Sequence, residues 1–366
     1  MWKIVPMRSF SDQRCEFGQL FWGLSRSEER GLWVASPLTL CEGACMAKLK
    51  APPAGAGSIQ KGSSLAEILS PPALRVLAEN LSSAHPAFAA ESFVREAARG
   101  LGGQSLFQRS HQIAAVLRSH LPERYEEALE ILMNSMPSRE LEKNLGLGVF
   151  FYLPHSQFIA NYGLDAEGNG GRDPFMASML AQRELTQRFT AEFSVRPFLI
   201  REPERSLKLL KQWVEHESEH VRRWCSEGSR PRLPWGMRIP ALIQNPRPTR
   251  SILEALKDDS SLYVRRSVAN HLGDVAKDNL DLALEWAEAW LKGASPQRLW
   301  VIRHALRYPA KKSVPRALKL RKLAKPLAAE AQSRVAQPKV RVNKKAKSLR
   351  PVKSRVKART PKRADG

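Results

Sequence analysis

The sequence has few cysteines and no long apolar segment. Only four cysteines occur among its 366 residues, and Cys41 and Cys45 form a lone CxxxC pair with no Cys or His nearby. A zinc site needs more ligands than this, so we expect no metal. The cysteines form no paired framework, which favours a reducing, cytoplasmic setting. No apolar run is long enough to cross a membrane and no signal-peptide pattern occurs, so we expect no membrane partner.

Familiar catalytic motifs are also missing. The chain contains no Gly-rich phosphate loop, HExxH, GxSxG or pair of CxxC motifs. His216 and His220 have the spacing of two metal ligands on one helix, but no third ligand is evident. The neighbouring Glu217 and Glu219 indicate a solvated face instead. We therefore predict neither a metal nor a cofactor.

Acidic residues are scarce relative to basic ones. The 36 Asp and Glu against 59 Lys and Arg leave a net charge of +23. Residues 310–366 hold 20 Lys or Arg and two acids, which is a net charge of +18. Residues 1–309 therefore carry a net charge of only +5. From about residue 324 large apolar side chains are few, and self-repulsion predicts a disordered tail over 324–366. Such tails are typical of nonspecific, salt-dependent binding to nucleic acid.

The rest of the chain divides into an extension and a helical domain. Residues 1–64 mix Gly, Pro and Ser without a sustained period, and residues 51–57 have the composition of a linker. Because Met46 precedes this linker, one hypothesis is that translation begins there; an intact mass that includes residues 2–45 would exclude it. Helical periodicity then runs from Ser70-Pro71 to about residue 308, without an alternating β pattern. We predict an all-α domain over 65–323.

An internal repeat narrows the architecture. A Val-Arg-Arg motif begins at Val221 and again at Val264, and a weaker copy begins at Val301. The intervals of 43 and 37 residues are typical of two-helix HEAT-like units. Coincidence among Val- and Arg-rich helices is the alternative, since the motif is short. A true repeat predicts a curved helical-repeat solenoid with a concave face.

Acids recur at nearly the same interval. In three predicted helices a cation stands four residues before an acid or amide, which places both on one face. These residues are Arg188 and Glu192 in helix 174–199, Arg223 and Glu227 in helix 218–228, and Arg266, Asn270 and Asp274 in helix 260–276. Stacked helices would bring the three acids together on the concave face. The alternative is a solvated face with intrahelical ion pairs, although cation-before-acid is the weaker order for helix stability.

A loop between the last two of these helices is unusual. Residues 227–236 contain two Pro and two Gly, which restrict the backbone, and Arg230 and Arg232 are suited to phosphates. Trp235 lies outside the helical period. Its usual role would be a packing anchor, and contact with a base or sugar is the alternative.

Several segments resemble the AlkC branch of the AlkC/AlkD family of HEAT-like repeat DNA glycosylases. The similarity covers about residues 65–310, and it is carried by segments 183–199, 220–223, 227–228, 230–236, 263–274 and 303–307. It implies a monofunctional glycosylase, without a cofactor, that binds double-stranded alkylated DNA as a monomer. The implied substrates are N3-alkylated bases, above all 3-methyladenine, with 3-methylcytosine as a second.

The resemblance also implies the site. Glu192, Glu227 and Asp274 match the catalytic carboxylates of the family, and Trp235 and Asn270 are expected to contact the substrate. The side chains expected to bind DNA are Arg222, Arg223, Arg230, Arg232, Arg265, Arg266, Arg303, His304 and Arg307. The chain departs from the family at its ends: residues 1–64 have no counterpart, and the basic tail stands where some relatives carry an immunoglobulin-like domain.

The implied chemistry is simple. An N3-alkylated base is cationic and leaves as a neutral molecule, so no general acid is needed. Carboxylates stabilise the oxocarbenium character on the sugar and orient water, with Asp274 in the leading role. The competing hypothesis is a non-catalytic helical-repeat scaffold that binds nucleic acid or protein. That hypothesis leaves unexplained why acids recur at repeat spacing in a basic protein.

Overall fold

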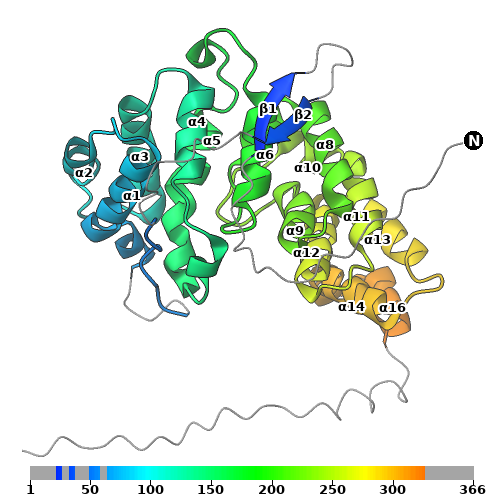
Figure 1. Ribbon diagram of the computed structural model, residues 1–366. Helices are drawn as coiled ribbons and strands as arrows, with labels where there is room; N and C mark the ends of the chain where they lie inside the picture. The colour runs from blue at the N-terminus through cyan, green and yellow to red at the C-terminus, as the bar shows by residue number, and fades with distance from the viewer. Residues whose placement is uncertain (1–21, 27–32, 38–48, 58–63, 326–366) are drawn as a thin grey trace, which may run out of the picture.

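The computed structural model describes residues 22–26, 33–37, 49–57 and 64–325 (Figure 1). From residue 65 to 325 every regular element is a helix, so the predicted all-α class is confirmed. None of the helices in the described ranges is both long and apolar enough to span a bilayer. The predicted tail lies outside the described residues from 326 onward.

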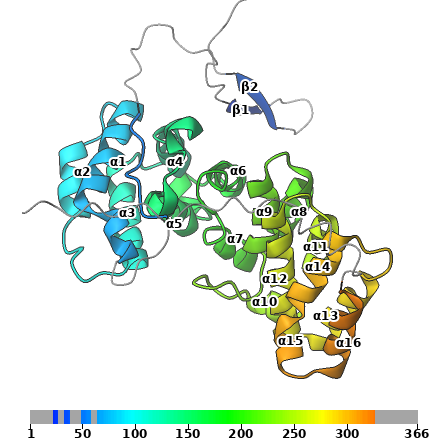
Figure 2. The ribbon, with the colours of Figure 1, turned by 90° about the horizontal axis from the view of Figure 1, so that it is seen from below.

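The helices follow one another in chain order along the molecule (Figures 1 and 2). The first group comprises α1 (Pro71–Ala84), α2 (Ala90–Ala97), α3 (Leu106–His120), α4 (Tyr125–Asn134), α5 (Leu153–Tyr162), α6 (Phe175–Leu185) and α7 (Val195–Arg201). The second comprises α8 (Pro203–Gln212), α9 (Glu219–Gly228), α10 (Pro240–Gln244), α11 (Arg250–Leu256), α12 (Leu262–Asp278), α13 (Leu280–Ala289), α14 (Pro296–Ala305), α15 (Arg307–Lys311) and α16 (Pro315–Leu323).

Local sequence explains where the main helices begin. At α3, the Ser105 hydroxyl accepts from the Gln108 backbone and the Gln108 side chain accepts in return, which is a complete capping box. The Ser261 hydroxyl caps α12, and the Ser295 hydroxyl caps α14 ahead of Pro296. These contacts satisfy amide groups that the first helical turn leaves without partners.

The predicted repeat corresponds to three neighbouring helices. Val221 lies in α9, Val264 in α12 and Val301 in α14, and each valine is fully buried. Helix α12 packs against α9 on one side and α14 on the other. The repeated motifs therefore mark equivalent, stacked positions, as the spacing predicts.

The prediction of one continuous helix over 174–199 is wrong. Helix α6 ends at Leu185 and α7 begins at Val195, so Glu192 and Arg188 lie in the non-helical segment between them. Within that segment the Thr186 hydroxyl accepts from the Ala191 amide at 3.4 Å, and the Thr190 hydroxyl accepts from the Glu192 amide at 3.2 Å. Such side-chain bonds compete with helical ones and favour turns.

Two helices begin at a proline. Helix α10 starts at Pro240, and helix α16, which lies beyond the predicted end of helical periodicity near residue 308, starts at Pro315. Proline fits the first turn of a helix, where its missing amide proton costs nothing.

Two parts of the predicted extension form backbone hydrogen bonds that its composition does not predict. Strands β1 (Trp22–Arg26) and β2 (Trp33–Pro37) form an antiparallel hairpin that pairs Trp22 with Pro37. The predicted linker 51–57 packs on the domain at helix η3 (Gly146–Tyr152). The Gly55 amide donates to the Leu145 carbonyl at 2.9 Å, and the Leu147 amide donates to the Ala56 carbonyl at 2.9 Å.

Replacing Gly148 by Ala is expected to release this segment. A Cβ atom on Gly148 would lie 2.4 Å from the Pro53 carbonyl oxygen and 2.8 Å from the Gly55 amide nitrogen, which are rigid backbone atoms. We expect a loss of about 1–3 kcal/mol in the free energy of unfolding, the usual cost of overpacking. Urea denaturation measures the loss, and faster proteolysis near Lys50 reports the release. Gly102→Ala is the control, because a Cβ there meets nothing within 4 Å. Equal stability of the two variants would contradict the docking.

Candidate active site

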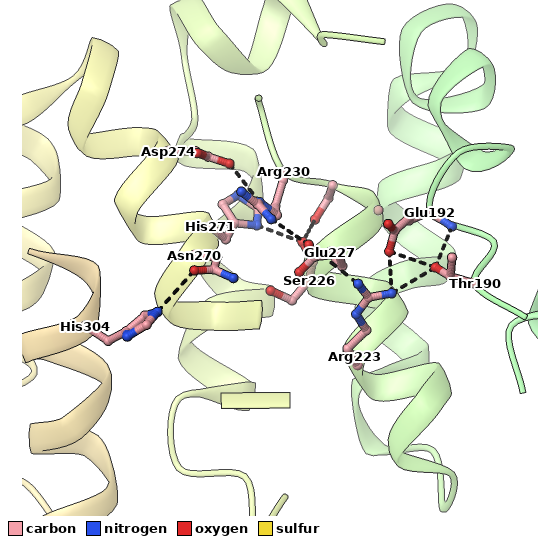
Figure 3. Close-up of polar contacts among 12 residues, drawn as sticks. Thr190, Glu192, Arg223, Ser226, Glu227, Arg230, Asn270, His271, Asp274 and His304 are labelled. Carbon is pink, nitrogen blue, oxygen red and sulfur yellow. Dashed lines mark hydrogen bonds and ion pairs between the residues drawn. The ribbon is translucent and has the colours of Figure 1, made fainter. Parts of the chain in front are cut away.

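The three predicted acids come from three separate elements and converge (Figure 3). Glu192 comes from the segment after α6, Glu227 from the last turn of α9, and Asp274 from α12, one turn before that helix ends. Their exposed fractions are 9%, 6% and 2%. These values exclude the solvated face that was the alternative.

Two arginines link the acids into one chain of ion pairs. Arg223 binds Glu192, and its Nη2 atom lies 3.5 Å from Oε1 of Glu227. Arg230 joins Glu227, at 2.5 Å from its Nη1 atom, to Asp274, at 2.7 Å from its Nε atom. We call Glu192, Arg223, Glu227, Arg230 and Asp274 the acid–arginine chain. Its carboxylates are thus held apart by guanidinium groups, which offset their mutual repulsion.

Two further side chains complete the ends of the acid–arginine chain. The Lys277 ammonium group lies 2.8 Å from Oδ1 of Asp274, and the Thr190 hydroxyl donates to Glu192 at 2.7 Å. Three cations therefore face three carboxylates. A buried set of charges with matched partners is tolerated in a protein interior, whereas an unmatched one is strongly unfavourable.

The electrostatics keep Glu227 ionised. Burial alone would raise the pKa of Glu227, but Arg223 and Arg230 outweigh it and hold this pKa below its ordinary value. Burial alone would likewise lower the pKa of Arg230, but Glu227 and Asp274 outweigh it and hold this pKa above its ordinary value. Glu227 is therefore a fixed negative charge at neutral pH and is unsuited to act as a general acid.

Arg196, which sequence reasoning missed, clamps the loop after α9. Its side chain is fully buried, its Nη1 atom donates to the Gly228 carbonyl at 2.9 Å, and its Nη2 atom donates to the Arg230 carbonyl at 2.8 Å. Its Nε atom donates to the Met237 carbonyl. Burial, and next the neighbouring Arg230, lower the pKa of Arg196 to about 10. The clamp fixes the loop that supplies Arg230; the only sequence signal is an arginine in the apolar run beside Val195.

Trp235 lies in the same loop with its ring in solvent. Its backbone has φ +63°, which is unfavourable for a residue with a Cβ atom, and 66% of the residue is exposed. The tryptophan and the neighbouring Arg232, Arg238 and Lys277 line an open groove of about 420 Å³. A packing anchor would be buried, so this predicted role does not fit. An exposed ring in a strained conformation is instead available to a ligand.

Asn270, the other predicted substrate contact, lies on α12 one turn before Asp274. Its Oδ1 atom accepts from Nη2 of Arg307 at 3.0 Å. The same atom lies 3.3 Å from Nε2 of His304 (Figure 3). The His304 ring stacks on Trp300, with centroids 4.8 Å apart. Asn270 therefore contacts the basic residues of α14 and α15 from a position one turn away from Asp274 on α12.

Many of the arginines predicted to bind DNA already have protein partners. Arg222 pairs with Asp259 at 2.6 Å, and Arg232 pairs with Asp278 at 2.6 Å. Arg265 donates to the backbone carbonyls of Asp259 and Ser260, and Arg303 donates to the carbonyl of Ala324. Arg266 is exposed and makes no ion pair within residues 64–325. The cations that remain for a ligand are thus fewer than the sequence suggests.

The histidine pair His216 and His220 has local partners. The His216 Nδ1 atom accepts from the Ser218 amide at 3.0 Å, and the His220 ring packs edge-on against Tyr263. In the described part of the chain no cluster of three or more His, Cys, Asp or Glu is arranged to hold a metal ion.

Comparison with known proteins gives two informative relatives. No family model matches the sequence. The uncharacterized protein YhaZ of Bacillus subtilis is 42% identical over 216 residues, which are 59% of this chain and 56% of that relative. The chain thus spans little more than half the length of this curated relative.

A solved structure gives the broader match. It is the Pseudomonas fluorescens alkylpurine DNA glycosylase AlkC bound to DNA containing an abasic site analog. That chain is 38% identical with a TM-score of 0.62, and the match covers 70% of this chain and 67% of the relative. With this identity over two thirds of the AlkC chain, and with the same helical-repeat fold, the protein belongs to the AlkC family.

Proposed function

We propose that this protein is a DNA glycosylase that hydrolyses the N-glycosidic bond of N3-alkylated bases in double-stranded DNA. The observation that carries the proposal is the chain of ion pairs that brings Glu192, Glu227 and Asp274 together (Figure 3). Lys277, which pairs with Asp274, lines the same groove as the exposed Trp235. The similarity to an alkylpurine DNA glycosylase supports it. We propose 3-methyladenine as the main substrate and 3-methylcytosine as a second.

The reaction needs negative charge that is held in position near the deoxyribose before the glycosidic bond breaks. As the cationic base departs, positive charge develops on the deoxyribose, and preorganised carboxylates stabilise it without reorganisation. Asp274 is the proposed water-orienting group. Its oxygens accept from Arg230 and Lys277, yet each carboxylate oxygen has a second acceptor site for a water molecule. Glu192 and Glu227 supply further negative charge, and Trp235 and Asn270 contact the damaged nucleotide.

The decisive experiment is incubation of the full chain with methylated duplex DNA and measurement of released base. We expect free 3-methyladenine together with an abasic strand of unchanged length, as simple hydrolysis requires. Binding to DNA without any release of base would contradict the proposal and favour the non-catalytic scaffold.

Deleting residues 326–366 is expected to weaken binding to undamaged duplex DNA. The deleted segment carries 13 Lys or Arg and two acids. Each phosphate that it neutralises contributes about 0.9 to the slope of log K against log salt, so the truncated protein should show a shallower slope. Filter binding at several salt concentrations measures this slope. A tail of equal length with Gln in place of Lys and Arg is the control and should behave like the deletion. An unchanged slope would exclude phosphate binding by the tail.

A further inference from the structure

A shallow cavity that is open to solvent lies where three helices meet, near the C-terminal end of the described domain. Its volume is about 270 Å³, and it is lined by Trp300, Arg303 and His304 of α14, Arg307 of α15, and Arg321 of α16. A water molecule occupies roughly 30 Å³, so this space holds a group of several heavy atoms. Each of the three helices thus points one arginine into one small space.

Two of these arginines lack a carboxylate partner. Arg307 donates to the His304 carbonyl at 2.6 Å and to the Asn270 amide oxygen at 3.0 Å, which are both neutral acceptors. The Nε atom of Arg321 is buried and has no hydrogen-bond partner among the described residues. Neither arginine forms an ion pair within residues 64–325. Within the described residues, the charges of Arg307 and Arg321 are therefore not paired with a carboxylate.

Two other arginines of the same helices have carboxylate partners. Arg316, five residues before Arg321 in α16, pairs with Glu288 at 2.5 Å, and Arg298 in α14 pairs with Asp258. The lack of a carboxylate partner at Arg307 and Arg321 is therefore not shared by every arginine of this region. Burial, and next the charges of Arg307 and Arg266, lower the pKa of His304 at the cavity to about 4, so this ring is neutral near pH 7.

We propose that this cavity is a phosphate-binding pocket that holds a single phosphodiester group of DNA between Arg307 and Arg321. Guanidinium groups suit phosphate oxygens, because their planar donors match two oxygens at once. The half-buried Trp300, stacked on His304, forms an apolar wall for the adjoining sugar. The choice of DNA as the source of the phosphate rests on the proposed function.

The pocket has a defined relation to the acid–arginine chain. Asn270 accepts from Arg307, and Asp274 follows Asn270 by four residues in α12, a rise of about 6 Å. A phosphate held by Arg307 is thereby fixed relative to Asp274. The pocket would set the register of the strand, while the acids act on its sugar.

The test uses the full chain and undamaged duplex DNA, so its outcome does not depend on base release. Arg307→Gln, Arg321→Gln and the double variant are compared by binding constants between about 50 and 300 mM salt. Because both arginines hold the same phosphate, the double variant should lower the salt slope by about 0.9, and not by about 1.8. For the same reason the double variant should lose less affinity than the product of the two single losses. Arg316→Gln, on the same helix, is the control and should leave binding unchanged.

Several results would overturn the proposal. An unchanged slope in the double variant would exclude the pocket as a DNA contact, and a loss of about 1.8 would mean that two separate phosphates are bound. An effect of Arg316→Gln as large as that of Arg321→Gln would indicate general attraction only. Titration with inorganic phosphate, followed through the His304 ring signals by NMR, distinguishes a site for free phosphate from a site for a DNA phosphodiester. A tight site for inorganic phosphate that Arg321→Gln removes, with DNA binding unaffected, would overturn the assignment to DNA.

Discussion

Replacing Asp274 by Asn is expected to lower the rate of base release by about 100-fold or more, the scale on which loss of one preorganised electrostatic group slows an enzyme. The amide has the size of the carboxylate but no charge, so it cannot stabilise positive charge on the sugar. Folding should survive, because Arg230 keeps Glu227 as its partner at 2.5 Å. DNA binding should also survive, because the substitution removes a negative charge and so adds no repulsion toward the DNA phosphates. Single-turnover release of 3-methyladenine measures the effect.

Asp278→Asn is the matched control for this experiment. Asp278 lies one turn further along α12 and pairs with Arg232 at 2.6 Å, so its replacement also removes one acid from an arginine pair on the same helix. This control should retain the rate of base release. Release at the wild-type rate by Asp274→Asn, or an equal loss in both variants, would reject the role of Asp274.

Replacing Arg230 by Met is expected to have the largest effect on stability. The change removes the cation shared by Glu227 and Asp274, which are 6% and 2% exposed. Removing one partner from a buried ion pair costs about 3–5 kcal/mol, because a charge is left without compensation. Arg223 and Lys277 remain beside the two acids, so we expect the lower end, about 3 kcal/mol. Urea denaturation near neutral pH measures the loss.

The pH dependence of this loss identifies its cause. Because the pKa of Glu227 lies below its ordinary value of 4.5 in the folded protein, its contribution to stability is complete above that value. The contribution is lost as the pH falls through the lowered pKa. In Arg230→Met the pKa of Glu227 should rise, so the difference from the wild type should shrink toward acidic pH. Adding Glu227→Gln to Arg230→Met should recover part of the stability near neutral pH.

A surface pair provides the control for Arg230. Arg232→Met breaks the pair between Arg232 and Asp278, which are both more exposed than Arg230 and Asp274, and should cost clearly less stability than Arg230→Met. Equal losses in Arg230→Met and Arg232→Met, or a loss in Arg230→Met that does not change with pH, would show that the buried charges do not set the stability of the site.

Much of the fold could be predicted, because helical periodicity and N-cap residues depend on amino acids that are close together in the chain. Periodicity over neighbouring residues gave most of the helices, and the serines at positions 105, 261 and 295 mark the starts of three of them. The intervals between Val221, Val264 and Val301 located three stacked helices. The predicted helix over 174–199 failed because threonine side chains, at positions 186 and 190, bind the backbone and turn it.

Sequence alone thus determined most of the helical segments, the spacing of the Val-Arg motifs and which three acids recur with the repeat. Tertiary structure decided what those acids touch, because Arg230 and Asp274 are 44 residues apart in sequence, and Arg196 and the Gly228 carbonyl are 32 apart. Helical periodicity carries no information over such separations. Whether an arginine donates to neutral groups, as Arg307 does, or to a carboxylate, as Arg232 does, depends on how the helices stack.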